Sequence, residues 1–191
     1  MKKIFKKIKL RKAKVGVIGL GYVGLPLCEV LLSKGYNVYG YDIDQKKIKD
    51  LYKKKIYITN FNPTNIYKQI NKKFFASKVN ESVVDLDIII ICVPTPLKNN
   101  IPDLSPLNKS ILSIKKYLQK HQTIIIESST YPGTTNKIFN TYLKKRFNLG
   151  NDFYLGYSPE REDPGNKHFK ISNTPKIVSG YTENCLKIVN L

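Results

Sequence analysis

A glycine-rich turn between a short apolar run and an amphipathic segment constrains the fold of this chain more than any other feature. The run Val15–Ile18 leads into Gly19, Gly21 and Gly24, which have the spacing G-x-G-x-x-G. Gly19 would let a strand turn sharply, Gly21 would let a pyrophosphate approach the backbone, and Gly24 would let the next helix pack closely on a sheet. That helix would direct its free N–H groups toward the phosphates. Because three glycines in six residues also occur in ordinary strand-to-helix turns, the interpretation depends on the rest of the chain.

Alternating apolar and amphipathic segments follow this turn. Apolar residues at helical spacing predict a helix over residues 22–34, and residues 37–42 form a second predicted strand. The strongest strand is predicted at residues 87–93, which are apolar on both faces, as in a buried parallel sheet. Further strands are predicted at 74–76, 123–126, 153–157 and 176–179, and further helices at 45–52, 80–84, 105–120, 134–147 and 182–191. This alternation predicts an α/β fold, a Rossmann-type doubly wound parallel sheet.

Two stretches interrupt the pattern. Residues 53–73 are polar and basic, and no structure is predicted for them. Pro94 and Pro96 follow the strand at 87–93, and we expect neither strand nor helix after it, because proline lacks the backbone donor. At 191 residues the chain has the length of one domain. We predict a basic extension over residues 1–13 and a single dinucleotide-binding domain over residues 14–191.

Basic residues dominate the charged composition. The formal net charge is +19, from 33 Lys and Arg against 14 Asp and Glu. Because the lysines are scattered through every segment, we interpret the charge as a bias of the whole chain and expect no nucleic-acid partner. Residues 1–14 hold eight Lys or Arg and no acid, but no apolar segment or cleavage site of a signal peptide follows them. We interpret residues 1–13 as a frayed extension.

Cysteine usage and hydropathy limit the class of protein further. Cys28, Cys92 and Cys185 are far apart and form no C-x-x-C pair. We therefore expect buried thiols in a reducing compartment, with no disulfide framework and no metal site. No apolar run approaches the roughly 18 residues that a membrane helix needs. We expect a cytoplasmic protein with no membrane partner.

Polar or proline-containing segments follow the predicted strands at five places. Ligands of doubly wound sheets bind beyond the carboxyl ends of the strands, where the strand order reverses. Five such segments on one sheet edge therefore support the dinucleotide interpretation far more than the glycines alone. They are Gly19–Gly24, Asp42, Pro94–Pro96, Ser128–Thr130 and Ser158–Glu160.

Asp42 ends the second predicted strand, 18 residues after Gly24. Near this spacing a carboxylate accepts hydrogen bonds from the adenosine ribose. Its charge would repel the extra phosphate of NADP, so NAD is the favoured cofactor. Alternatively, Asp42 is the N-cap of the helix at 45–52, although Asp44 is the more plausible cap.

Six sequence motifs extend from the glycine turn nearly to the end of the chain. They are Gly19-Leu-Gly-Tyr-Val-Gly-Leu-Pro26, Cys92-Val-Pro-Thr-Pro-Leu97, Pro102-Asp-Leu-Ser105, Glu127-Ser-Ser-Thr-Tyr-Pro-Gly-Thr-Thr135, Tyr157-Ser-Pro-Glu-Arg161 and Asp163-Pro-Gly-Asn166. Together they resemble the nucleotide-sugar dehydrogenases of the UDP-glucose/GDP-mannose dehydrogenase family. The resemblance is greatest to the branch of UDP-N-acetylglucosamine or UDP-N-acetylgalactosamine 6-dehydrogenases.

The resemblance implies oxidation at C6 of a UDP-sugar, expected to be a UDP-N-acetylhexosamine, from alcohol to carboxylate with reduction of two NAD. It implies that Glu160 is the acid/base or water-orienting carboxylate, with a salt bridge to Arg161 as the alternative role. It implies that Thr130 positions a water or the substrate hydroxyl. The cofactor contacts that it implies are Gly19, Leu20, Gly21, Tyr22, Val23, Gly24, Asp42, Lys47, Val93, Pro94, Thr95, Ser129 and Thr130.

The resemblance also implies that part of the machinery lies elsewhere. In this family the nucleophilic cysteine, the Lys and Asn of the central helix and most of the substrate surface belong to regions beyond residue 191. None of the three cysteines here has the Gly-rich surroundings of that nucleophile. We therefore expect a domain truncated before the central helix and the C-terminal domain, which binds NAD and is inactive alone. Its expected partner is the missing catalytic half or a second copy of the chain.

Three other interpretations remain open. Rossmann dehydrogenases of the 3-hydroxyacyl or 6-phosphogluconate type share the glycine turn but not the motifs around Tyr131 and Glu160. A catalytically inactive NAD-binding or interaction module would keep the fold without the reaction. Nucleic-acid binding would require an affinity that survives physiological salt.

Overall fold

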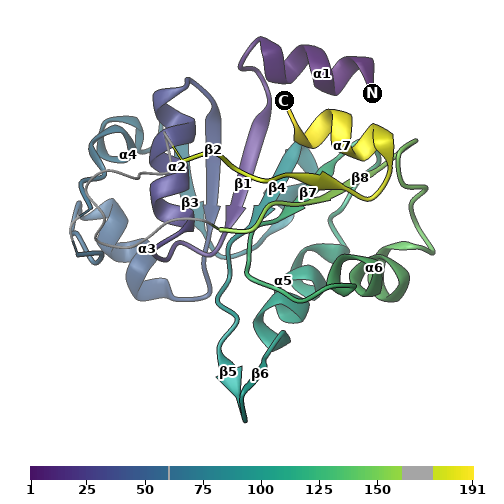
Figure 1. Cartoon of the computed structure of the whole chain (residues 1–191). Helices are drawn as coiled ribbons and strands as arrows, with labels where there is room; N and C mark the ends of the chain where they lie inside the picture. The colour runs from purple at the N-terminus through teal and green to yellow at the C-terminus, as the bar shows by residue number, and fades with distance from the viewer. Residues whose placement is uncertain (60, 161–173) are drawn as a thin grey trace.

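Seven β-strands form the central sheet in the computed structural model, which describes residues 1–59, 61–160 and 174–191 (Figure 1). They are β1 (Lys14–Ile18), β2 (Asn37–Tyr41), β3 (Phe74–Ser77), β4 (Ile88–Ile91), β7 (Thr123–Ile126), β8 (Tyr154–Tyr157) and β9 (Ser179–Gly180). Their order across the sheet is β3-β2-β1-β4-β7-β8-β9, and every pair is parallel except β8 with β9. From β3 to β8 this is the strand order typical of dinucleotide-binding sheets. The predicted Rossmann-type doubly wound sheet is confirmed.

Helices connect the strands and cover the sheet. They are α1 (Lys2–Lys9), α2 (Gly24–Ser33), α3 (Gln45–Tyr52), α4 (Thr64–Gln69), the 3₁₀ helix η1 (Glu81–Asp85), α5 (Ser105–Lys115), α6 (Thr134–Ile138), the π-helix η2 (Phe139–Leu143) and α7 (Glu183–Val189). The chain moves one way across the sheet from β1 to β2 and the other way from β4 to β7. Right-handed crossovers therefore place α2 and α5 on opposite faces. The strand order reverses between β1 and β4.

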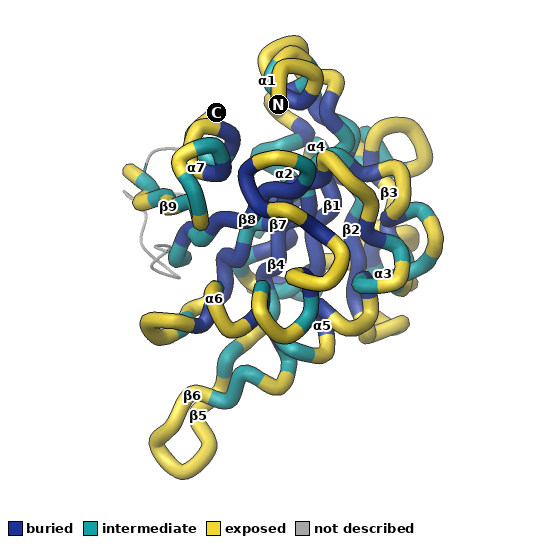
Figure 2. Tube along the Cα trace, turned by 90° about the vertical axis from the view of Figure 1, so that its right-hand side faces the viewer, coloured by how far each residue is buried: buried dark blue, intermediate teal, exposed yellow. Residues whose placement is uncertain are grey.

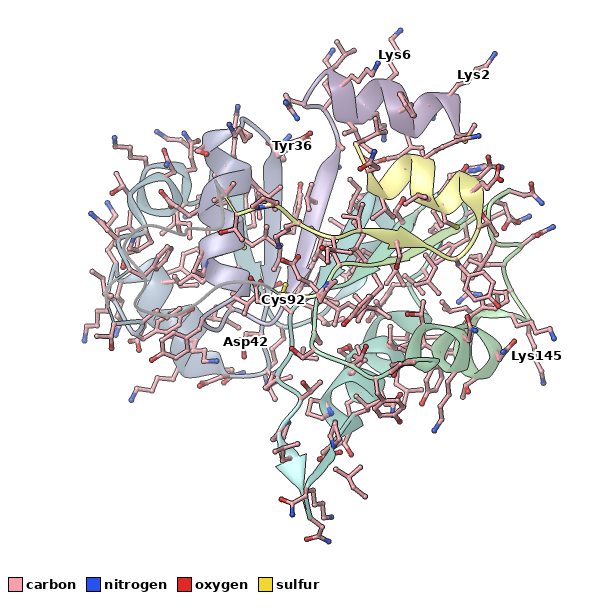
Figure 3. All side chains as sticks on the ribbon, in the orientation of Figure 1. Lys2, Lys6, Tyr36, Asp42, Cys92 and Lys145 are labelled. Carbon is pink, nitrogen blue, oxygen red and sulfur yellow. The ribbon has the colours of Figure 1, made fainter. Side chains whose placement is uncertain are left out.

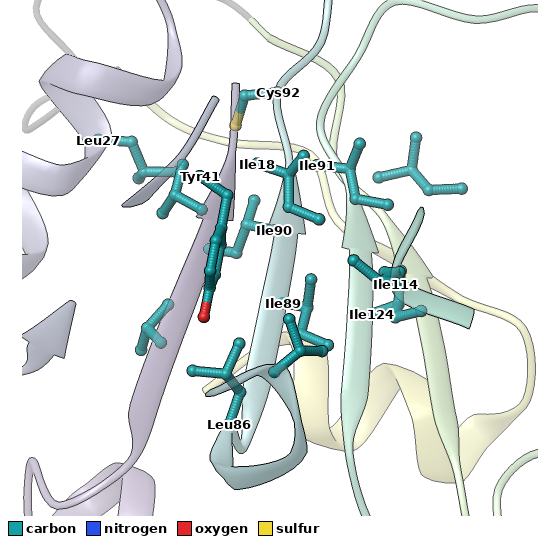
Figure 4. Packing of buried hydrophobic residues seen from close by; sticks show 14 of the residues in the cluster. Ile18, Leu27, Tyr41, Leu86, Ile89, Ile90, Ile91, Cys92, Ile114 and Ile124 are labelled. Atoms are coloured by element: carbon teal, nitrogen blue, oxygen red, sulfur yellow. The ribbon is translucent and has the colours of Figure 1, made fainter. Parts of the chain in front are cut away.

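The middle of the sheet is the core of the molecule. Figure 2 shows the central strands as the most continuously buried part of the trace. β4 consists of four isoleucines, and Figure 4 shows its side chains packed between those of β1 and β7. Ile89 and Ile91 are fully buried. Burying one such side chain stabilises a fold by about 1.5–3 kcal/mol, which explains why the β4 sequence specifies a central strand.

The basic extension is not frayed, as we had expected, but contains the helix α1. Ile4 and Ile8 lie one helical turn apart on it and are 4% and 5% exposed, so they belong to the core. The Lys7 ammonium also donates to Asp87 Oδ1 at 2.5 Å. The prediction was wrong because it rested on the number of charged residues and not on the spacing of these two isoleucines, which form an apolar stripe on a helix.

A short hairpin follows the prolines at residues 94 and 96, where we had expected no strand. It pairs β5 (Leu97–Lys98) with β6 (Ile101–Pro102) in antiparallel register. Asn99 and Asn100 between them have φ values of 52° and 60°. Two consecutive positive φ angles at asparagines are typical of the type I′ turn, which matches the twist of a hairpin.

Residues 53–73, for which no structure was predicted, contain the helix α4. Its first turn is capped from another helix, because Glu29 of α2 accepts hydrogen bonds from the backbone N–H groups of Asn65 (2.7 Å) and Ile66 (2.9 Å). A carboxylate at this position satisfies unpaired donors and complements the helix dipole. Glu29 is 36 positions before Asn65 in the sequence, so no local sequence pattern predicts this cap.

Several predicted ends also differ from the structure. α5 ends at Lys115 rather than at residue 120, and the Arg146 guanidinium donates to the carbonyl of Lys115 at 2.5 Å. The helix predicted at 134–147 is divided into α6 and η2. The last strand is β9, which covers Ser179–Gly180 rather than residues 176–179 and runs antiparallel to β8.

Candidate cofactor-binding site

A cavity of about 890 Å³ lies at the carboxyl ends of β1 and β4, where the strand order reverses. Figure 3 shows Asp42 and Cys92 near each other at this edge of the sheet. All five strand-end segments of the sequence analysis contribute to its lining. The predicted site residues among the lining are Gly19, Gly21, Tyr22, Val23, Asp42, Lys47, Val93, Pro94, Thr95, Ser129 and Glu160.

Three predicted site residues do not line this cavity. Leu20 is fully buried, and its backbone N–H donates to Asp42 Oδ2 at 2.8 Å. Gly24 is buried in the first turn of α2. Thr130 is half-buried next to Ser129. Leu20 and Gly24 therefore contribute to the shape of the glycine turn, and the role of Thr130 stays a prediction.

The three glycines of the turn meet different surroundings. Gly19 has φ +95°, and a Cβ there would lie 2.5 Å from the carbonyl oxygen of Cys92. A Cβ at Gly24 would collide with the carbonyl oxygen of Gly19. A Cβ at Gly21 would meet no atom within 4 Å, because Gly21 faces the open cavity. Gly19 and Gly24 are thus needed to close the turn, whereas Gly21 leaves free space between the backbone and the cavity.

The Asp42 carboxylate is held firmly at the mouth of this turn. Its side chain is 7% exposed and accepts hydrogen bonds from the backbone N–H groups of Leu20 (2.8 Å) and Asp44 (2.9 Å). The Lys47 ammonium lies 3.4 Å from its Oδ2 atom. The Oδ1 atom, which accepts from Asp44, keeps a second lone pair that suits a hydroxyl of a ribose. The N-cap of α3 is Asp44, which accepts from Lys46 N at 2.8 Å, as predicted.

Tyr57 joins the glycine turn from the region without a predicted structure. Its hydroxyl donates to the carbonyl of Leu20 at 2.9 Å. Burial raises the pKa of Tyr57 far above its usual range, and the nearby Asp42 carboxylate raises it further. Tyr57 is therefore a neutral donor that fixes the turn from outside. No local sequence pattern indicates this contact across 37 residues.

Two glutamates and a lysine meet at the other end of the cavity. Glu127 follows β7 and Glu160 follows β8, and both line the cavity. The Lys176 ammonium contacts Glu127 Oε1 and lies 4.0 Å from Glu160 Oε2. We call these three residues the carboxyl cluster. Glu160 was predicted from the sequence. Glu127 was not, although Glu127 directly follows a predicted strand, and neither was Lys176.

Glu127 is only 4% exposed within the carboxyl cluster. Burial raises the pKa of its carboxyl above the ordinary value, the Lys176 ammonium opposes this rise, and the Glu160 carboxyl adds to it. A buried acid beside a second acid and one cation holds a proton more readily than an exposed glutamate does. This end of the cavity therefore contains a carboxyl group that is protonated more readily than an exposed glutamate.

Cys92 lies at the end of β4 and lines the cavity as a buried thiol. Burial raises its pKa well above the ordinary value, and the Glu127 carboxylate adds to the rise. A thiol that resists ionisation is a poor nucleophile. Cys28 and Cys185 are also buried and free.

The part of the chain that the structure describes limits other chemistry. Within it, no group of three or more His, Cys, Asp or Glu is placed to hold a metal ion. None of its helices is long and apolar enough to cross a membrane. Arg161, the alternative ion-pair partner of Glu160, and the motif at 163–166 lie outside the described residues.

The strand order, the glycine turn and the buried carboxylate at the second strand define a Rossmann-type dinucleotide-binding domain. The chain belongs to the UDP-glucose/GDP-mannose dehydrogenase family, because residues 13–190 match the NAD binding domain of that family. NAD is the cofactor of this domain.

Relatives and solved structures agree with this assignment. The chain is 39% identical over 178 residues to "Protein CapL" of Staphylococcus aureus, covering 92% of this chain and 41% of that protein. It is 38% identical over 186 residues to a UDP-N-acetyl-D-glucosamine 6-dehydrogenase of Pseudomonas aeruginosa, covering 95% and 43%. The structure of a UDP-D-ManNAc dehydrogenase from Pyrococcus horikoshii superposes with a TM-score of 0.84 at 30% identity, covering 93% and 43%. The chain thus spans about two fifths of the length of these relatives.

Proposed function

We propose that this chain supplies the NAD-binding part of an enzyme that oxidises C6 of a UDP-sugar to the carboxylate. The observation that carries the proposal is that one cavity joins the glycine turn and Asp42 to the carboxyl cluster. Such a cavity combines dinucleotide binding at one end with proton transfer at the other. Similarity to UDP-N-acetyl-D-glucosamine and UDP-N-acetyl-D-mannosamine dehydrogenases favours a UDP-N-acetylhexosamine as substrate.

The residues of the turn would bind the cofactor. Asp42 would accept hydrogen bonds from the adenosine ribose, with Lys47 beside it. The open space above Gly21 would receive the pyrophosphate, near the N-terminus of α2. Val93, Pro94 and Thr95 would line the path toward Ser129. Tyr22 and Val23 complete the wall on the side of the turn.

When bound in this cavity, NAD would supply the hydride acceptor for the carbon that is oxidised. Glu160 would accept the alcohol proton or orient the water that the second oxidation consumes. Thr130 would position that water or the substrate hydroxyl. Glu127 and Lys176 would hold the Glu160 carboxyl in place and adjust its charge. We further propose that the protein works in the cytoplasm, supported by three free, buried thiols among the described residues.

Calorimetry and turnover measured together test this proposal. We expect the 191-residue chain to bind NAD and to produce no NADH from UDP-N-acetylglucosamine or UDP-N-acetylmannosamine by itself. Joining it to the remaining part of the Pseudomonas aeruginosa relative should restore NADH production, with that relative's own first part as the matched control. Absence of NAD binding contradicts the cofactor role. Uronate production by the chain alone contradicts the partial-enzyme role, and an inactive chimera beside an active control favours an inactive NAD-binding module.

A further inference from the structure

The helix α1 carries a surface that neither the cofactor site nor the family match explains. The family match begins at residue 13, whereas α1 covers Lys2–Lys9. Its outer side forms a shallow hollow of about 440 Å³. We call this surface the α1 patch, and the residues that line it are Met1, Lys2, Phe5, Lys6, Lys9 and Leu10.

The inner side of α1 is fixed to the fold. Ile4 and Ile8 are buried in the core. The hydroxyl of Tyr36 donates to the carbonyl of Ile8 at 3.1 Å and accepts from the Arg11 guanidinium at 2.6 Å. Lys7 is bonded to Asp87. Because these contacts hold the helix, its outer side faces solvent in one defined orientation.

The outer side combines cations with exposed apolar groups. Met1 is 45% exposed and Leu10 52% exposed, and the Lys9 ammonium lies 5.2 Å from the centre of the Phe5 ring. Lys2 and Lys6 point outward from the helix (Figure 3). The first acidic residue of the chain is Glu29, so no carboxylate in the sequence of α1 neutralises these cations.

Although the sequence led us to expect no membrane partner, we propose that the α1 patch docks on the surface of an anionic lipid bilayer. Lysines on a short amphipathic helix are attracted by anionic headgroups, and apolar side chains between them enter the boundary of the acyl chains. A nucleic acid would pair with the lysines but would leave Met1 and Leu10 exposed to its phosphates. The mixed character of the patch therefore fits a lipid surface better.

The position of α1 is compatible with an active cofactor site. α1 precedes β1, whereas the glycine turn follows it. The patch therefore lies at the amino ends of the parallel strands, and the cavity lies at their carboxyl ends (Figure 1). The five residues of β1 alone separate these two ends by about 17 Å. Docking through α1 thus leaves the cavity open to cofactor and substrate.

Co-sedimentation with vesicles tests this inference independently of the dehydrogenase proposal. We expect the chain to bind vesicles of phosphatidylcholine and phosphatidylglycerol at physiological salt, and not vesicles of phosphatidylcholine alone. The double variant Lys2→Glu/Lys6→Glu should lose roughly tenfold or more of this binding. The matched control Lys144→Glu/Lys145→Glu changes the net charge equally at exposed positions of another surface and should bind nearly as the parent does. NAD binding of both variants shows that they are folded.

Two further measurements separate lipid insertion from simple charge attraction. The chain contains no tryptophan, so Leu10→Trp adds a single fluorescent reporter at the patch. We expect a blue shift of its emission with the anionic vesicles and a severalfold loss of binding in Leu10→Ser. Absence of vesicle binding, or equal loss in both charge variants, overturns the inference. Duplex DNA that displaces the vesicles and is bound through the same lysines also overturns it.

Discussion

The two ends of the cavity are built in different ways. At the glycine turn, one continuous stretch of backbone makes the surface, and Asp42 and Tyr57 hold it by hydrogen bonds to Leu20. At the carboxyl cluster, three side chains from distant parts of the chain meet, and one of them is a buried acid. The shape of the first end depends on glycines that leave room for the backbone. The properties of the second end depend on the charges of three side chains. We therefore expect substitutions at the first end to change NAD affinity and substitutions at the second end to change the protonation of Glu127.

Gly24→Ala should have the largest effect, because it tests whether the turn must close. Its Cβ would collide with the carbonyl oxygen of Gly19, which is backbone and has little freedom to move. We expect a loss of about 3 kcal/mol in the free energy of unfolding and no measurable NAD binding. Urea denaturation and calorimetry provide the two readouts. Unchanged stability would show that the turn tolerates a side chain and would remove the proposed difference between the two ends.

Gly21→Ala separates binding from folding at the same end. The added methyl meets no atom within 4 Å, so the free energy of unfolding should stay nearly unchanged. The same methyl occupies the space proposed for the pyrophosphate, and we expect NAD affinity to fall roughly a hundredfold, or about 2.7 kcal/mol. Calorimetry measures the affinity. NAD binding equal to that of the parent would place the pyrophosphate elsewhere.

The coupling within the carboxyl cluster should appear in the pH dependence of the free energy of unfolding rather than in the affinity for NAD. Because the pKa of Glu127 is raised, the folded protein holds this proton more tightly than the unfolded chain. Its contribution to stability is complete below the ordinary Glu pKa of about 4.3 and is lost as pH rises through the folded value. Relative to Glu127→Gln, the parent should lose stability over this range by at most about 1.4 kcal/mol per pH unit.

Lys176→Met provides a second test of the same pH dependence of stability. The Lys176 ammonium opposes the rise in the Glu127 pKa, so its removal should extend the loss of stability to higher pH. Urea denaturation at a series of pH values compares the parent, Glu127→Gln and Lys176→Met. Parallel profiles for all three proteins would contradict the coupling within the carboxyl cluster.

Asp44→Ala should have the smallest effect and serves as a local test of the glycine-turn end. Asp44 caps α3 by accepting from Lys46 N, and its loss should lower the free energy of unfolding by about 1 kcal/mol. NAD affinity should change little, because Asp42 keeps its bond from Leu20. A large loss of NAD affinity in this variant would assign to Asp44 the ribose role given to Asp42.

The sequence predicted those parts of the molecule that local patterns determine. The spacing of the glycines, the four isoleucines of β4 and the acid at the end of β2 were enough for the sheet and for one end of the cavity. Several of the contacts that were missed join distant residues. Glu29 caps α4 across 36 positions, and Lys176 reaches Glu127 across 49. Such pairs arise only when the topology brings the segments together.

The N-terminal helix shows a different reason for failure. Among its many charged residues, Ile4 and Ile8 have helical spacing and are buried in the core. Net charge describes the solvent-facing side of a segment, whereas burial is decided by the periodicity of its apolar residues. A count of charges therefore gave the wrong prediction of a frayed extension.

A crystal structure of this chain with NAD tests the central claim most directly, namely that one dinucleotide spans both ends of the cavity. We expect the adenosine ribose on the Asp42 carboxylate, the pyrophosphate over Gly21 and the nicotinamide between Ser129 and Glu160. An NAD molecule bound in the opposite direction, or outside the cavity, would contradict the account.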